Sequence, residues 1–182
     1  MEYYQVLGLE PKLSLDPEDL KQRFYGRSRL WHPDRFIHAN PLERERALDM
    51  TALLNDAFRT LREPASRAEY FLKQHGLELS KDPPPELLEE VFDLNLMMEE
   101  LREGDNSARR DLESARDRFA GMLAQIDAEL QELFAGYDLS QSREILDEIQ
   151  QALSRRRYIS NLVRDANKEL NVPGTSHSNA AN

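Results

Sequence analysis

Apolar positions recur along the chain every three or four residues, which is the spacing that places them on one face of an α-helix. The first long stretch begins at Asp16-Pro17, because Asp suits the helix N-cap and Pro the first helical position. Its apolar face consists of Leu20, Phe24 and Trp31. Pro33 lacks an N–H and pushes the preceding residue out of the α region, so we expect this helix to end at about His32.

A second long helix follows a loop over residues 35–40. Asn40-Pro41 with Glu43 in the first turn is a helix start, and Glu63-Pro64 ends the pattern. The apolar face of this helix consists of Ala47, Met50, Leu54, Phe58 and Leu61. The short connection predicts an antiparallel pair, with the His32–Asp34 connector at the end that the two helices share.

Shorter elements flank this helix pair. An apolar opening over residues 4–9 predicts one or two helical turns, and residues 65–75 predict a helix that Gly76 closes. Residues 77–85 end in three consecutive prolines, which form a stiff, extended spacer. We therefore predict a first domain over residues 1–76 and a linker over the spacer.

Beyond the spacer the pattern predicts three long helices, over residues 86–103, 107–136 and 141–170. Short Gly-containing connectors at 104–107 and 136–140 separate them, and short connections make antiparallel neighbours. We therefore expect an all-α protein whose second domain, 86–170, is a three-helix bundle. The tail, 171–182, is rich in Ser, Asn and Ala without periodicity, so we expect it to be disordered.

The helix over residues 86–103 has more apolar positions than a bundle needs. One complete core face consists of Leu87, Val91, Leu94, Met98 and Leu101. A second apolar line of Leu88, Phe92 and Leu96 is rotated from it by about 140°, and its rim is acidic, with Glu89, Asp93 and Glu99. Exposed apolar patches with polar rims mark partner sites. The alternative is that this line packs on the first domain or widens the bundle core.

Composition narrows the classes of function. The 182 residues include no Cys, which excludes disulfides, thiol catalysis and Cys-ligated metal sites. A net charge of −10 argues against a nucleic-acid partner, and no apolar run approaches a membrane span. The opening residues lack an export signal. His38, His75 and His177 lack metal-ligand spacing, so we expect no metal site. The acidic charge and the lack of an export signal predict a cytoplasmic protein whose partners are proteins.

The His32–Asp34 connector contains two polar residues, His32 and Asp34, that we expect to be exposed. Loop residues held by a rigid scaffold carry function more often than buried ones do. One alternative is a plain helix stop; another is half of a catalytic triad, which we reject because no motif indicates an activated nucleophile.

Lys21, Tyr25 and Arg29 form an outward stripe on the first long helix, which is usually a solvated face. No glycine loop suited to phosphates is present, so we expect no nucleotide and no cofactor.

Several of these segments together resemble a J-domain, the module by which co-chaperones activate DnaK-type ATPase chaperones. They are Leu30-Trp31, His32-Pro33-Asp34 and the helix ending in Leu54-Asn55-Asp56-Ala57-Phe58-Arg59-Thr60-Leu61. The segment Arg67-Ala68-Glu69-Tyr70-Phe71-Leu72 and the Phe92-Asp93-Leu94 helix look like the HscB branch, the J-proteins of iron–sulfur cluster assembly. The resemblance extends from Glu2 to about Leu170.

The resemblance implies roles for particular residues. His32, Pro33 and Asp34 would contact the ATPase chaperone and trigger ATP hydrolysis. J-domains generally carry a basic pair about seven residues before the histidine, where this chain has Tyr25 and Gly26. The cations that could replace that pair are Lys21, Arg29 and Arg35.

The resemblance also places an IscU-like iron–sulfur scaffold protein on the helix from residue 86. The implied contacts are Leu88, Glu89, Phe92, Asp93 and Leu96, with Phe92 as the anchor, because aromatic residues are frequent interface hot spots. Tyr158, beside Arg155, Arg156 and Arg157, would extend that surface; a solvated basic face is the alternative. The lack of Cys implies the bacterial form, without the metal module that some eukaryotic members carry.

We therefore expect a co-chaperone without catalysis of its own, which stimulates a DnaK/HscA-type chaperone and delivers the scaffold to it. One alternative is a J-domain co-chaperone with a different client, in which case the apolar line would not be a scaffold-binding surface. Another is a structural helical protein that self-associates through the same line. An enzyme is the least supported reading.

Overall fold

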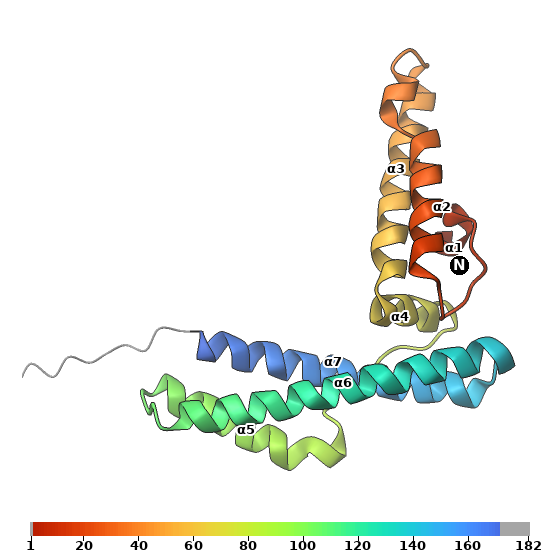
Figure 1. Cartoon of the computed structure of the whole chain (residues 1–182). Coiled ribbons are helices and arrows are strands. Elements are labelled where there is room, and N and C mark those ends of the chain that lie inside the picture. The colour runs from red at the N-terminus through yellow and green to blue at the C-terminus, as the bar shows by residue number, and fades with distance from the viewer. Residues whose placement is uncertain (1, 172–182) are drawn as a thin grey trace, which may run out of the picture. The chain divides into compact units, whose positions relative to one another are not determined.

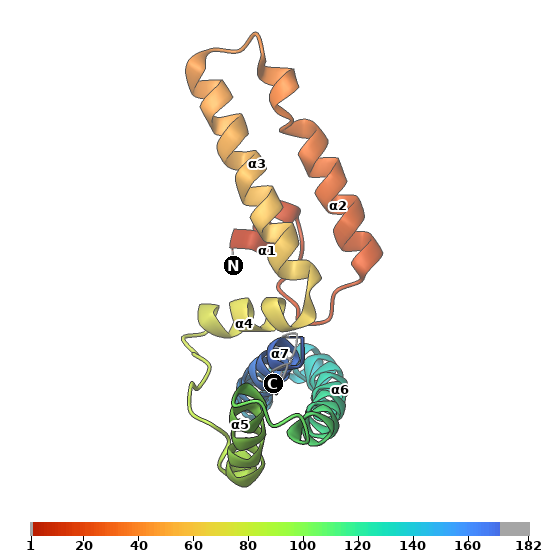
Figure 2. The same ribbon diagram turned by 90° about the vertical axis from the view of Figure 1, so that its left-hand side faces the viewer.

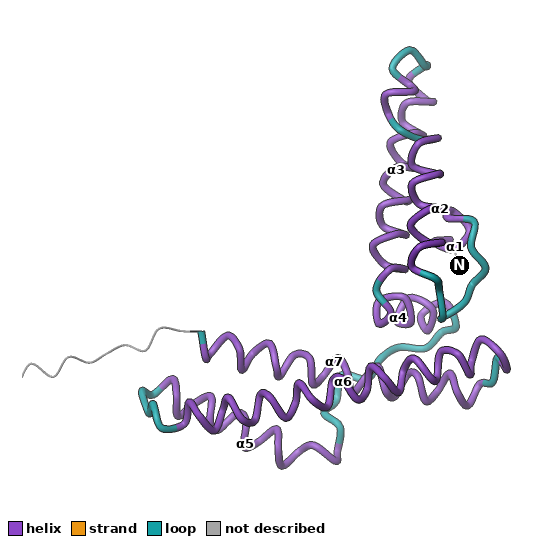
Figure 3. The backbone as a smooth tube through the Cα atoms, viewed as in Figure 1, coloured by secondary structure: helices purple, strands orange, loops and turns teal. Residues whose placement is uncertain are grey.

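The computed structural model describes residues 2–171 and folds them into helices without a strand (Figures 1 and 3). The all-α class expected from the sequence is confirmed. The described residues form two compact units. The first unit holds residues 2–79 and 131–150, and the second unit holds residues 80–130 and 151–171. No helix in this part of the chain is both long and apolar enough to cross a bilayer.

The centre of the first unit is an antiparallel hairpin of α2 (Pro17–Leu30) and α3 (Pro41–Arg62), which run side by side (Figures 1 and 2). Both helices begin at their predicted caps. The Asp16 carboxylate accepts a hydrogen bond from a first-turn N–H at 2.9 Å. Asn40 and Glu43 each accept from the other's backbone N–H, which is a capping box. The first residue of each helix in the hairpin is therefore determined by its neighbours in the sequence.

Apolar contacts hold the hairpin together. The rings of Phe24 and Phe58 stack with their centroids 4.3 Å apart. The fully buried side chains of the two helices are Leu20, Ala47, Leu54, Ala57 and Leu61. Two shorter helices, α1 (Glu2–Leu7) and α4 (Pro64–Gln74), also belong to this unit, and α4 runs across the end of the hairpin (Figure 2).

The loop between α1 and α2 is fastened by side chains from two of these helices. The buried Tyr4 hydroxyl donates to the carbonyl of Lys12 at 3.0 Å. The buried Arg67 guanidinium donates to the carbonyls of Leu13 at 2.7 Å and Leu61 at 2.6 Å. Burial raises the pKa of the Tyr4 hydroxyl and lowers that of the Arg67 guanidinium, because both charged forms lose water. Hydrogen bonds to carbonyls replace that water for the arginine.

The second unit contains α5 (Leu88–Arg102), most of α6 (Ala108–Ser140) and most of α7 (Arg143–Leu170), which lie side by side (Figures 1 and 2). A short 3₁₀ turn, Pro85–Leu87, precedes α5. The three long helices of the predicted bundle are thus present. Ion pairs join them: Arg102 binds Glu169. The core side chains of this unit include Val91, Leu94, Met98, Leu112, Phe119, Ile126, Ile159 and Leu162.

The connector predicted at residues 136–140 is wrong, because α6 continues through Gly136 to Ser140. A glycine inside a helix costs only about 1 kcal/mol, and the contacts of the following turn outweigh it. Tyr137 is buried against Phe71, and the Asp138 carboxylate accepts hydrogen bonds from the loop after α1. The helix ends instead at Ser140, and the next residue, Gln141, has a left-handed φ of 51°.

Tyr137 and Asp138 belong to the same compact unit as the loop and α4. The domain ranges 1–76 and 86–170 and the linker 77–85 stay predictions. The disordered tail predicted over 171–182 lies outside the described residues, apart from Asn171.

Candidate functional site

The His32–Asp34 segment lies at the free end of the α2–α3 hairpin. Helix α2 ends at Leu30, and Trp31 is its C-cap. His32 has extended backbone, with φ −62° and ψ 130°, as a residue before proline is expected to have. Pro33 then opens a short 3₁₀ turn, Pro33–Phe36, within the stretch that the sequence left as connector and loop.

The two polar side chains of this segment face solvent and lie close to each other. The side chain of His32 is 59% exposed and that of Asp34 is 79% exposed. His32 Nδ1 accepts the Asp34 backbone N–H at 3.3 Å and lies 3.5 Å from Asp34 Oδ2. The His32 imidazole therefore caps the 3₁₀ turn Pro33–Phe36, and the exposed Asp34 carboxylate is available to a partner.

Contacts on both sides hold this turn in place. The rings of Trp31 and Phe36 stack with centroids 5.9 Å apart and planes 7° from parallel. The Arg35 guanidinium donates to the carbonyl of Arg29 at 3.5 Å, so these two predicted cations lie beside the motif. Lys21 lies two turns earlier on α2, about 12 Å along the helix axis from Arg29, with its Nζ 3.8 Å from a Glu18 carboxylate oxygen.

A second surface lies on α5 in the second unit. Leu88 is 52% exposed, Phe92 is 68% exposed and Leu96 is 46% exposed. The core side of the same helix buries Val91, Leu94 and Met98. The apolar line that the sequence marks as surplus is therefore outside the core within the described residues, and the alternative of a wider bundle core does not hold.

The other residues predicted for this surface lie on α5 and α7. Glu89 and Asp93 are exposed on α5, and Tyr158 is half-buried on α7. The arginines before Tyr158 have protein partners and do not form the solvated basic face that the sequence left as an alternative. Arg155 pairs with Glu129 at 3.1 Å, and Arg156 pairs with Asp127. Arg157 donates to the carbonyl of Ser80 at 3.0 Å, so the run ties α7 to α6 and to the chain before α5.

Comparison with known proteins assigns the chain to one family. The DnaJ domain profile matches residues 2–70, and the profile of the HSCB C-terminal oligomerisation domain matches residues 83–167. A co-chaperone protein HscB homolog of Neisseria meningitidis is 30% identical over 175 residues, covering 93% of this chain and 99% of the relative. The chain belongs to the HscB family of co-chaperones.

Further HscB proteins match this chain in sequence and in fold. A homolog from Vibrio vulnificus is 33% identical over 151 residues, which cover 81% of each chain. The solved chaperone HscB from Vibrio cholerae superposes with a TM-score of 0.67 at 25% identity, covering 92% of this chain and 96% of that one. Human co-chaperone HscB has the same fold, with a TM-score of 0.61, 24% identity and coverage of 92% and 81%. The bacterial relatives agree with the bacterial form expected from the sequence.

Family membership gives this chain its general function. HscB proteins are J-domain co-chaperones that serve iron–sulfur cluster assembly, and their J-domain acts on an ATPase chaperone of the Hsp70 type. The sequence resemblance to the HscB branch is thereby confirmed. At the two positions of α2 where J-domains usually carry a basic pair, this HscB chain has Tyr25, which is exposed, and Gly26.

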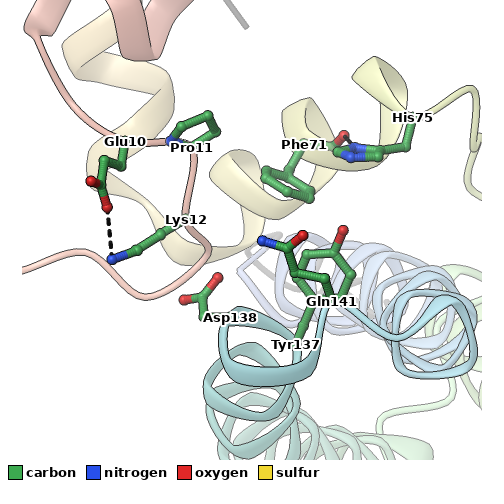
Figure 4. Close-up of a pocket in the computed structure, with 8 residues that line it drawn as sticks. All are labelled: Glu10, Pro11, Lys12, Phe71, His75, Tyr137, Asp138 and Gln141. Atoms are coloured by element: carbon green, nitrogen blue, oxygen red, sulfur yellow. Dashed lines mark hydrogen bonds and ion pairs between the residues drawn. The ribbon is translucent and has the colours of Figure 1, made fainter.

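Sequence reasoning missed one further feature of the HscB chain. A cavity of about 350 Å³ lies in the first unit, between the loop after α1, helix α4 and the C-terminal end of α6 (Figure 4). Its polar lining groups already have partners: Lys12 pairs with Glu10 at 2.9 Å, and His75 Nδ1 lies 2.9 Å from the carbonyl of Phe71. No local pattern could have indicated it, because residues more than 120 positions apart form it.

Proposed function

We propose that the His32–Asp34 end of the hairpin is the surface that contacts a DnaK/HscA-type chaperone and triggers its ATP hydrolysis. Pro33 has a preset φ, so ordering this turn on binding costs little entropy. Asp34 is exposed and suits a charge-assisted hydrogen bond from an arginine of the chaperone. Arg29 and Arg35 beside the motif, and Lys21 further along α2, would steer an acidic surface toward it.

We propose that the second partner is an IscU-like iron–sulfur scaffold protein, which binds the apolar line of α5. The single observation that carries this proposal is the exposure of Leu88, Phe92 and Leu96 on a helix whose other face is the core. Phe92, the most exposed of the three, is the anchor. Glu89 and Asp93 on α5, and Tyr158 on α7, complete the contact surface.

In this proposal the chain is a cytoplasmic adaptor with no catalysis and no cofactor of its own. It brings the scaffold to the chaperone, and the chaperone's ATP cycle then assists transfer of the cluster. An alternative is that the same J-domain serves a different client, in which case α5 would not bind the scaffold.

Self-association through α5 is a second candidate function. The name of the matching profile, an oligomerisation domain, favours it. Sedimentation over a range of concentrations separates the candidates, using the wild type and Phe92→Asp. A charge in a self-contact would shift the distribution toward monomer, whereas a scaffold-binding role alone would leave sedimentation unchanged.

The deciding experiment measures chaperone ATPase activity with co-chaperone and scaffold present. We expect His32→Gln to abolish stimulation while the helical circular dichroism stays unchanged. We expect replacement of Leu88, Phe92 and Leu96 by Ala to remove scaffold binding. The matched control for binding replaces three similarly exposed residues of the first unit, Ile37, Leu42 and Leu48. Full stimulation by His32→Gln, or unchanged scaffold binding by the α5 variant, would refute the corresponding half of the proposal.

A further inference from the structure

Thr51 of α3 reaches across the hairpin to the backbone that leads into the exposed motif. Its hydroxyl donates toward the carbonyl of Trp31, with Oγ1 and the carbonyl oxygen 3.0 Å apart. The same Oγ1 lies 2.7 Å from the carbonyl of Ala47, one turn earlier on α3. Because a hydroxyl has one proton, the two carbonyls share it. Trp31 immediately precedes His32, so Thr51 contacts the last peptide group before the motif.

This contact satisfies a group that a helix end ordinarily leaves to water. The last carbonyls of an α-helix have no intrahelical donor, and Trp31 is the C-cap of α2. A threonine inside a helix is a weak helix former, and its bond to the carbonyl four residues earlier only competes with the helix. The bond to Trp31 is different, because it links α3 to the chain at the point where α2 has ended.

We propose that Thr51 is a positioning residue for the chaperone contact: its hydroxyl fixes the Trp31 peptide, so that His32, Pro33 and Asp34 are presented already ordered. This inference rests on the function proposed above for that motif. Thr51 fixes the backbone before the motif, while the stacked rings of Trp31 and Phe36 fix the turn from both sides. A preordered contact loses less conformational entropy on binding, so its effect is on affinity.

The test compares Thr51→Val, which removes the hydroxyl but keeps the branched shape, with Thr51→Ser, which keeps the hydroxyl. Chaperone ATPase is measured against co-chaperone concentration. We expect Thr51→Val to raise the half-stimulating concentration about fivefold, the effect of losing one typical hydrogen bond. Maximal stimulation at saturation stays within about twofold of wild type, since His32 and Asp34 are intact, and Thr51→Ser restores the wild-type curve.

Thr60→Val is the matched control, because Thr60 is a half-buried threonine of the same helix outside the motif. A second readout needs no chaperone: backbone ¹⁵N order parameters of His32 and Asp34 fall in Thr51→Val and recover in Thr51→Ser. Thr51→Ala, with a stronger helix former, takes the place of Thr51→Val if the valine variant does not fold.

Two results would overturn the inference. One is an unchanged half-stimulating concentration and unchanged order parameters in a folded variant that lacks the hydroxyl. The other is a lower maximal rate at an unchanged half-stimulating concentration, which would assign Thr51 to the trigger and not to positioning. A wild-type chain that stimulates no ATPase would instead refute the proposed function, and the order parameters alone would then decide the role of Thr51.

Discussion

Arg67 is the charged side chain that the core of the described residues encloses, with 5% of it exposed. Its guanidinium joins the loop carbonyl of Leu13, which is far from it in the sequence, to the carbonyl of Leu61 near the end of α3. The sequence presents Arg67 only as part of a family signature. The structure gives it a physical role, which is to hold the α1–α2 loop against the hairpin.

We expect Arg67→Met, which keeps a long side chain but removes every donor, to lower the free energy of unfolding by about 3 kcal/mol. Two buried carbonyls lose charge-assisted hydrogen bonds in this variant. Urea unfolding followed by circular dichroism measures the change. Arg59→Met is the control, because the Arg59 side chain is 75% exposed and its pair with Asp56 contributes little. Equal stability of the two variants would contradict a fastening role for Arg67.

Among the elements, the last turn of α6 depends most on distant contacts. Asp138 accepts the backbone N–H groups of Leu13 at 2.8 Å and Ser14 at 2.7 Å. We expect Asp138→Ala to lower the free energy of unfolding by about 2 kcal/mol, since a part-buried donor loses its acceptor. Amide hydrogen exchange of Leu13 and Ser14 also becomes faster.

Asp147→Ala is the control for this variant, because the Asp147 carboxylate makes an exposed pair with Arg143 on the same helix. Its removal costs about 0.5 kcal/mol or less. Slow exchange at Leu13 and Ser14 in Asp138→Ala would mean that the loop is ordered without the carboxylate.

The contrast between helix starts and this helix end shows what local sequence determines. Asp16-Pro17 and Asn40-Pro41 start helices through contacts within three residues, so the pattern predicts them correctly. Glycine at 136 marks a break by local rules, yet contacts 124 and 125 residues away in sequence extend α6 past it. The surplus apolar line of α5 follows from counting apolar faces, but its exposure does not, because the sequence left packing of this line as an alternative.

The two faces of helix α5 have different roles: the buried face stabilises the fold, and the exposed face is the proposed binding surface. We expect Leu94→Ala to cost about 3 kcal/mol of unfolding free energy, because Leu94 is fully buried. Replacing Leu88, Phe92 and Leu96 together by Ala changes it by no more than about 1 kcal/mol, since these side chains are largely exposed. Thermal unfolding measures both. A large loss in the triple variant would show that the line supports the fold and is not a free surface.

At the scale of the whole molecule, the two candidate surfaces belong to different compact units of one chain. The His32–Asp34 motif is in the first unit, and α5 is in the second. The residues proposed for each surface all lie within one unit, so the proposal allows each partner to be bound separately. An adaptor gains from having both on one chain, because the second binding step then becomes intramolecular.

This linkage predicts that two half-defective chains do not replace one intact chain. An equimolar mixture of His32→Gln and the Leu88, Phe92 and Leu96 to Ala variant contains both intact surfaces, but on separate molecules. We expect the scaffold-dependent part of ATPase stimulation to stay near the level of the variants alone, while wild type at half the total concentration gives the full effect. The Ala variant keeps its scaffold-independent stimulation, which verifies that its motif works. If the mixture matches wild type, the surfaces act independently, and adaptor is the wrong description of the molecule.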